Sequence, residues 1–197
     1  GFGGGFNDFS GYRDPAAGAG QDLESAMSLT LAEAFNGVQR RVGLGNETLT
    51  VKIPAGVKSG SRIRVKEKGQ INPISRRRGD LYLVVEIKPH SFFKLEGDQL
   101  SCELPITPDE AVLGAAVEVP TPDGSVTMNI PANLRSGQTL RLRGKGWRNP
   151  SGERGDQMVR VMIVPPATIS DNERQLYEQL RAARSTDPRG HLKQMHL

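Results

Sequence analysis

Apolar and polar residues alternate with a period of two along much of residues 49–87. Leu49, Val51 and Ile53 are separated by polar residues, and the same alternation recurs in 63–65 and 81–87. Successive side chains of a strand point to opposite faces, so each of these segments has one apolar face. The pattern predicts half-buried antiparallel β-strands.

Helices are predicted from signals at their ends. Two short helices are marked by the capping boxes Thr30/Glu33 and Thr107/Glu110 and by the terminal glycines Gly37 and Gly114. A third capping box, Ser170/Glu173, predicts a helix of about 14 residues near the C-terminus, over 171–184. Leu176, Tyr177 and Leu180 lie on one side of this helix. A helix this short is marginal alone in water, so its apolar side needs either the second domain or another copy of the chain.

One unit of about 75 residues occurs twice. Segment 50–69 and segment 127–146 are identical at 9 of 20 positions. The offset of 77 residues also relates Gly37 to Gly114. Such internal similarity indicates a duplicated fold. The sequence predicts a mainly β protein made of two tandem, homologous β-sandwich domains, each with a short helix, followed by a C-terminal helix.

The predicted boundaries follow from the repeat. Residues 1–21 are rich in Gly and Phe and are interpreted as the end of a flexible linker. The first β-domain is predicted over 22–97 and the second over 98–166. Residues 167–197 form the predicted dimerisation helix and tail.

Composition narrows the classes of function. The chain has 197 residues, of which 36% are hydrophobic, and it contains neither an apolar run of membrane-spanning length nor a secretion signal. Its single cysteine, Cys102, excludes an intrachain disulfide, and the histidines and Cys102 lack zinc-site spacing. Phosphate-binding and dinucleotide motifs are also absent. We therefore expect a cytoplasmic protein that is not an enzyme and needs no cofactor or metal.

Charge is uneven along the chain. Residues 22–97 contain 13 Lys and Arg against 8 Asp and Glu, whereas residues 98–165 contain 7 against 8. The first domain is thus the one that favours an acidic partner, although a solvated surface explains the same balance.

The motifs resemble one known family. VKIPAGVKSGSRIRVKEKG (51–69), the long segment 79–106, LGAAVEVPTPDG (113–124) and GDQMVRVMIVPP (155–166) are similar to the C-terminal substrate-binding region of DnaJ-type co-chaperones. The His-Pro-Asp signature of the J-domain is absent. The resemblance implies that this chain is a fragment beginning in the linker, which would not by itself stimulate a DnaK-type ATPase. The Cys-x-x-Cys elements are absent too. That places the chain nearer the zinc-free branch, which includes curved-DNA-binding proteins.

The resemblance also implies a client-peptide groove in the first domain. Alternation puts Met27 and Leu29 on one face of segment 23–29, and Val42 and Leu44 on one face of segment 38–44. If the two segments border each other, these side chains line an apolar groove that Phe93 closes at one end. Arg40 and Arg41 would lie at the rim, where the acidic tail of a DnaK-type partner would bind. From the residues alone, a stripe such as Met27, Val42 and Leu44 is more often plain core, and Phe93 fits a core as well as a groove.

Three hypotheses follow. The first is a co-chaperone fragment that binds extended apolar segments of unfolded proteins and delivers them to a DnaK-type chaperone, as a homodimer joined through the C-terminal helix. The second is binding of curved DNA through the basic first domain. The third is a passive dimeric scaffold.

Overall fold

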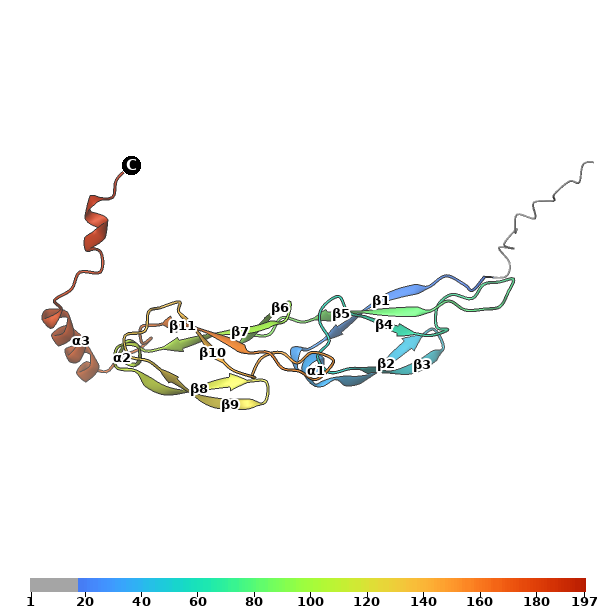
Figure 1. Ribbon diagram of the computed structural model, residues 1–197, viewed down its shortest axis with the longest axis horizontal. Coiled ribbons are helices and arrows are strands. Elements are labelled where there is room, and N and C mark those ends of the chain that lie inside the picture. The colour runs from blue at the N-terminus through green and yellow to red at the C-terminus, as the bar shows by residue number, and fades with distance from the viewer. Residues whose placement is uncertain (1–17) are drawn as a thin grey trace, which may run out of the picture.

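A computed structural model describes residues 18–197 and contains two similar β-rich units placed end to end (Figure 1). The elements of the first unit are β1 (Leu23–Leu29), α1 (Leu31–Asn36), β2 (Val38–Leu44), β3 (Glu47–Ile53), β4 (Arg62–Val65) and β5 (Leu81–Ile87). Those of the second are β6 (Phe93–Glu96), β7 (Gln99–Ile106), α2 (Pro108–Leu113), β8 (Ala115–Thr121), β9 (Gly124–Ile130), β10 (Thr139–Leu142) and β11 (Gln157–Ile163). Helix α3 (Asp171–Ala183) and a short 3-10 helix (Gly190–Gln194) follow.

Each unit consists of two layers. In the first unit, a three-stranded sheet of order β1-β5-β4 faces the pair β2-β3. In the second, a four-stranded sheet of order β10-β11-β7-β6 faces the pair β8-β9. The predicted mainly β class is confirmed, and the elements recur in the same order, so that β7 corresponds to β1 and β11 to β5. Within residues 18–197, strand β6 is the one strand of the second unit that has no counterpart in the first.

The prediction that all strands are antiparallel is wrong for one pair in each unit. Strand β1 runs parallel to β5, and β7 runs parallel to β11. A parallel pair needs a long crossover, and here the helix, the β2-β3 hairpin and β4 all lie between the two partners. The remaining pairs are antiparallel.

The helix signals act as the sequence indicates. In α1, the Thr30 hydroxyl accepts from the Glu33 N–H at 3.2 Å, while the Glu33 carboxylate accepts from the Thr30 N–H at 2.9 Å. The same reciprocal pair links Ser170 and Glu173 at the start of α3. Gly37 ends α1 with a φ of +76°, a conformation that a residue with a Cβ rarely adopts.

Each unit has its own apolar core, and Trp147 of the second unit belongs to the core of the first. Although it belongs to the second unit, its buried ring lies edge-on to Phe35 of α1, with the centroids 5.4 Å apart. Its indole N–H donates to the carbonyl oxygen of Gly56 at 3.3 Å. Arg148 also places its guanidinium 5.0 Å from the Phe35 ring. The loop of the second unit is therefore seated on the helix of the first.

The edges of the units differ slightly from the predicted boundaries. The turn at 97–98 lies between β6 and β7, which belong to one sheet, so the chain passes from the first sheet to the second between Ile87 and Phe93. Residues 20–21 already bond to the first unit, because the Gly20 N–H donates to the Arg77 carbonyl at 3.0 Å. Residues 1–17 of the predicted linker lie outside the described residues. Among residues 18–197, no helix has the length and apolarity needed to cross a membrane.

Candidate peptide-binding site

Two of the predicted groove residues belong to the core. Leu29 is completely buried, and Met27 is 8% exposed. Both side chains point between the two layers of the first unit, where they pack with β5. Leu29 and Met27 are therefore corrected from groove-lining to core residues. Segments 23–29 and 38–44 belong to different sheets, because β1 bonds to β5 and β2 bonds to β3.

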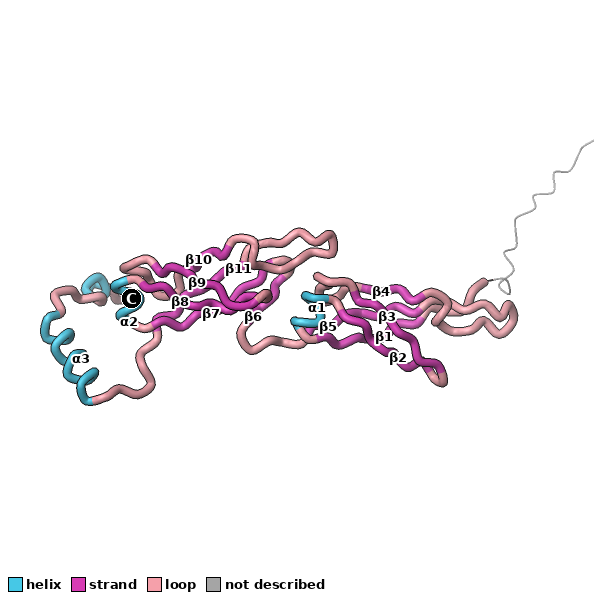
Figure 2. The backbone as a smooth tube through the Cα atoms, turned by 90° about the horizontal axis from the view of Figure 1, so that it is seen from below, coloured by secondary structure: helices cyan, strands magenta, loops and turns pink. Residues whose placement is uncertain are grey.

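The other predicted residues of β2 are accessible. Val42 and Leu44 are half-buried and pack against the rim of the first core. Arg41 points the other way and is exposed. In Figure 2, β1 and β2 are labelled towards one side of the unit and β4 towards the opposite side. Val42 and Leu44 belong to β2, which in this view lies towards the same side of the unit as β1.

Strand β1 has a free edge on this side. It is the outermost strand of its sheet among the described residues. The Leu23 N–H donates to Asp80, and the Leu29 carbonyl accepts from Lys88, so the odd-numbered residues bond to β5. The backbone groups of the alternate residues Glu24, Ala26 and Ser28 consequently point away from β5. These groups are available to an additional strand.

The second unit shows what a strand in this position does. There the corresponding edge, that of β7, is occupied by β6. The side chains beneath β6 are buried, and they are Leu100, Cys102, Val119 and Thr121. Their equivalents in the first unit, at the offset of 77 residues, are more exposed, and they are Leu23, Ser25, Val42 and Leu44. We call these four residues the β1–β2 seam. In the part of the chain that the structure describes, no strand covers the seam as β6 covers its counterpart.

Arg40 lies on β2 between Val38 and Val42 and is held by α1. Its Nη2 forms an ion pair with Glu33 Oε1 at 2.6 Å. The pKa of Glu33 is lowered, first by the hydrogen bond from the Thr30 backbone and then by Arg40. The Nε of Arg40 is buried without a hydrogen-bond partner among the described residues. A buried N–H without a hydrogen bond destabilises the fold, and this N–H is able to donate to a carbonyl or carboxylate oxygen of a ligand.

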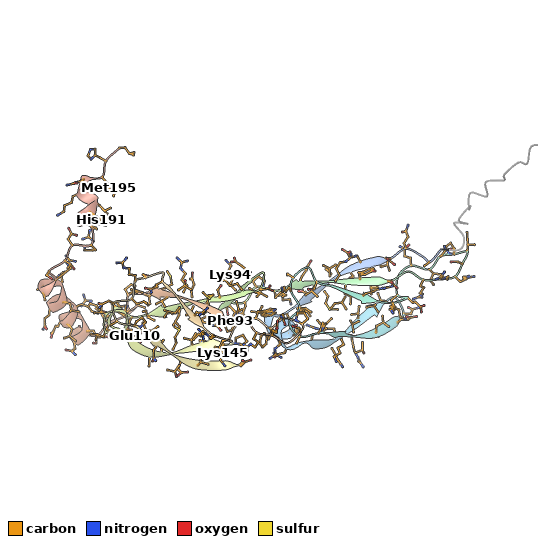
Figure 3. The ribbon with its side chains drawn as sticks, in the orientation of Figure 1. Phe93, Lys94, Glu110, Lys145, His191 and Met195 are labelled. Atoms are coloured by element: carbon orange, nitrogen blue, oxygen red, sulfur yellow. The ribbon has the colours of Figure 1, made fainter. Side chains whose placement is uncertain are left out.

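Phe93 does not close the end of the seam. It lies on β6, opposite Cys102, and contributes to the junction between the two cores (Figure 3). Its N–H donates to Nδ1 of His90 at 3.1 Å. The prediction of Phe93 as a groove residue is corrected because the chain has already entered the second sheet at this point.

The sequence did not point to a cavity of about 1060 Å³ next to β6. It is lined by residues 87–97 and by the outer face of the second sheet, including Met158 and Met162. The alternation in 157–163 places these two methionines on the face opposite Val159 and Val161. An outward apolar residue at alternate positions was the available signal. It was obscured because Arg160, which is exposed, lies between the two methionines on that face.

Helix α3 leaves its apolar side uncovered. Leu176, Tyr177 and Leu180 are 50%, 38% and 64% exposed, and none of the residues of α3 is buried. The second unit does not cover these three side chains. Of the two partners expected for this side of the helix, only another copy of the chain stays a prediction. Among the described residues, no group of three His, Cys, Asp or Glu side chains is arranged to hold a metal ion.

Comparison with known proteins identifies similar chains. The family model described as the DnaJ C terminal domain matches residues 23–166. A DnaJ-like protein of Synechocystis is 56% identical over 185 residues, which are 94% of this chain and 55% of the relative. Chaperone protein DnaJ 2 of the same organism is 40% identical over 190 residues, covering 93% of this chain and 60% of the relative.

A Curved DNA-binding protein of Coxiella burnetii is 40% identical over 187 residues, covering 88% of this chain and 59% of the relative. This chain therefore spans between 55% and 60% of the length of these three proteins.

Proposed function

Because the chain belongs to the DnaJ C-terminal domain family, we propose that it holds extended apolar segments of unfolded proteins at the β1–β2 seam, as part of a co-chaperone. The observation that carries the proposal is the difference between the units. Val42 and Leu44 are half-exposed beside a free strand edge, whereas Val119 and Thr121 are buried where β6 fills the same position.

Binding at the seam needs no bond-making. An added strand gains hydrogen bonds from the free backbone groups of β1 or β2, and its alternate side chains cover the apolar residues between them. Burying one large apolar side chain contributes about 1.5–3 kcal/mol before the cost of ordering the peptide. The binding is therefore weak and reversible, as is needed for transfer of a client to a second chaperone of the DnaK type.

The C-terminal helix supplies the proposed dimer. The exposed side of α3 carries Leu176, Tyr177 and Leu180, and pairing with a second copy would bury them. Two copies present two seams, so a client that reaches both gains avidity. The acidic tail of a DnaK-type partner is proposed to bind beside Arg40 and Arg41, where the free Nε of Arg40 and the exposed charge of Arg41 lie.

Suppression of client aggregation tests the proposal. Light scattering is followed after a denatured client is diluted into buffer with the wild-type chain or with Leu44→Thr combined with Val42→Thr. Leu44→Thr introduces the amino acid that stands at the equivalent position of the second unit, and Val42→Thr keeps the shape of the side chain. Folding should therefore be retained. We expect the double variant to lose most of the suppression and Ile74→Asp, an exposed apolar site outside the seam, to keep it. Full suppression by a folded double variant would refute the proposal.

A second candidate function is binding of DNA through the first unit. It is favoured by the relatives named Curved DNA-binding protein and by the exposed Lys66 and Arg76. Phosphate contacts release counterions, so affinity for DNA should fall steeply with salt, whereas apolar peptide binding should change little. Arg76→Ala is expected to reduce, by about 1, the steepness of the plot of log affinity against log salt concentration. If both the slope and the affinity for DNA are unchanged, the loop that carries Arg76 does not contact DNA.

A further inference from the structure

We propose that residues 18–22 and the loop 69–80 form a latch, which opens as one element while the rest of the first unit stays folded. The loop lies between β4 and β5 and extends to the end of the molecule opposite to α3 (Figure 1). The chain enters the first unit through residues 18–22, so an open latch releases this segment. The inference does not rest on the proposed function, because it concerns neither the seam nor a client.

Backbone hydrogen bonds join the segment to both arms of the loop. The Gln70 N–H donates to the Gln21 carbonyl at 2.8 Å. From the other arm, the Arg77 carbonyl accepts from the Gly20 N–H at 3.0 Å. The two arms also bond to each other, because the Gly79 N–H donates to the Gln70 carbonyl at 2.9 Å. The segment and the loop therefore share one hydrogen-bond network.

Side chains bond to the two ends of the segment. At one end, Ser75 Oγ and the side-chain amide of Asn72 both donate to the Gly18 carbonyl, at 2.6 and 3.1 Å. At the other end, the Asp80 N–H donates to Asp22 Oδ1 at 2.6 Å. The bonds thus run along the whole segment, and contiguous bonds of this kind open together.

The latch is held without a buried apolar side chain. Within 69–80 the buried residues are Gly69 and Gly79, whereas Ile71 and Ile74 are 48% and 71% exposed. Local opening requires less free energy where few apolar contacts are lost and where the hydrogen bonds lie near solvent. The latch therefore opens at a lower free energy than the sheet to which it is attached.

Two residues of this region have a backbone conformation that favours glycine. Glu67 and Arg76 have φ values of +56° and +59°. Their equivalents in the second unit are Gly144 and Gly152, with φ values of +68° and +92°. A residue with a Cβ is strained at positive φ, and this strain is relieved when the loop opens. The first unit thus favours opening more than the second unit does.

The equivalent loop of the second unit, 146–156, has a different anchor. Both loops contain an isolated antiparallel bridge between corresponding positions. In the second unit, however, Trp147 is 3% exposed and packs in the core of the first unit. Its equivalent, Gln70, is exposed and bonds to the incoming chain at Gln21. Of the two loops, the one in the first unit is therefore the one that depends on residues 18–22.

Opening of the latch changes where the preceding chain is attached. With the latch closed, the chain is held from Gly18 onwards. With the latch open, the first held residue is Leu23, at the start of β1. Residues 18–22 span up to about 17 Å when they are extended. Two lengths of tether are therefore available to whatever the chain carries before Gly18.

Hydrogen exchange of the full wild-type chain, followed by NMR, tests the latch without a variant. We expect the amides of Gly20, Gln70 and Gly79 to have protection factors within about threefold of one another. These factors should be at least about tenfold below those of Leu83 and Val85 in β5. Protection equal to that of β5, or unrelated protection at the three amides, would overturn the inference.

Gly20→Ala and Gly18→Ala form a matched pair of variants. A Cβ at position 20 would overlap the carbonyl oxygen of Gln70, whereas a Cβ at position 18 meets nothing within 4 Å. We expect Gly20→Ala to lower the protection of the Gly79 amide at least about tenfold, and Gly18→Ala to change it less than about twofold. Circular dichroism checks that both variants fold. Equal effects of the two variants would contradict the latch.

Relief of the backbone strain should have the opposite effect. Arg76→Gly introduces the amino acid of the second unit at a position with positive φ. We expect this variant to raise the protection of the Gly79 amide about threefold. A lowered protection would show that strain does not favour opening.

Limited digestion with trypsin compares the two loops in one sample. Trypsin cleaves after Lys and Arg, and cleavage of a folded chain follows the population of the open loop. We expect the wild-type chain to be cleaved within 76–78 before it is cleaved after Arg148 or Arg154, as identified by mass spectrometry. Gly20→Ala should accelerate the cleavage within 76–78, and Gly18→Ala should not. Earlier cleavage of the second loop would overturn the inference.

Discussion

Truncation of Trp147 is predicted to destabilise the first unit although the residue belongs to the second. The ring is 3% exposed, lies 5.4 Å from the ring of Phe35 and bonds to the carbonyl of Gly56. Replacing such a buried aromatic side chain by Ala costs about 3–5 kcal/mol, and this includes the cavity left against α1. Trp147→Phe keeps the ring contact and loses the hydrogen bond, which costs about 1 kcal/mol.

Urea unfolding followed by far-ultraviolet circular dichroism measures the effect. In the wild-type chain, Trp147 is the only tryptophan, so its fluorescence independently reports when the junction opens. We expect the urea midpoint of the first unfolding transition to be much lower for Trp147→Ala than for Trp147→Phe. We also expect the two units of Trp147→Ala to unfold in separate transitions. Equal midpoints for the two variants would refute the claim that the units are coupled through this ring.

Four other predictions concern stability, pH and assembly. Gly56→Asn should separate the units, because a Cβ at position 56 would approach the carbonyl oxygen of Arg148 to 2.2 Å; an unchanged Trp fluorescence maximum would contradict this. The lowered pKa of Glu33 stabilises the fold above the ordinary glutamate pKa, and this contribution is lost as pH falls through the lowered value. The stability difference between the wild type and Glu33→Gln should therefore shrink on acidification, and a constant difference would count against the ion pair. The thiol of Cys102, whose pKa is raised by burial, should react with a disulfide reagent only when the protein unfolds, as measured by absorbance. A chain ended at Pro166 should sediment as a monomer, and a persisting dimer would exclude α3 as the interface.

Local elements were predictable because their signals are local. The reciprocal bonds of Thr30 with Glu33 form within one turn, and the alternation in 81–87 directly gives the buried face of β5. The neighbour of a strand is not a local property. Alternation in 23–29 indicates which face is apolar, but it does not indicate that β1 pairs in parallel with β5.

The distinction between groove and core also depends on distant residues. Segments 23–29 and 100–106 show similar alternation, yet Leu23 is half-buried and Leu100 is buried, because Leu100 lies opposite Leu95 of β6 and packs in the cluster that contains Trp147 and the core of the first unit. Likewise, the sequence around Trp147 gives no indication that its ring is inserted beside Phe35. Val42 and Leu44 on β2 therefore stay a predicted site, whereas Met27 and Leu29 are core residues and Phe93 lies on β6.

Mapping of a bound client on the two units tests the account most directly. Amide resonances of an isotope-labelled chain are followed by NMR while an unlabelled apolar peptide is added. The account predicts shifts at Ala26, Val42 and Leu44 that are absent at their equivalents in the second unit, Glu103, Val119 and Thr121. Shifts confined to the cavity around residues 87–97, or of equal size in both units, would contradict it.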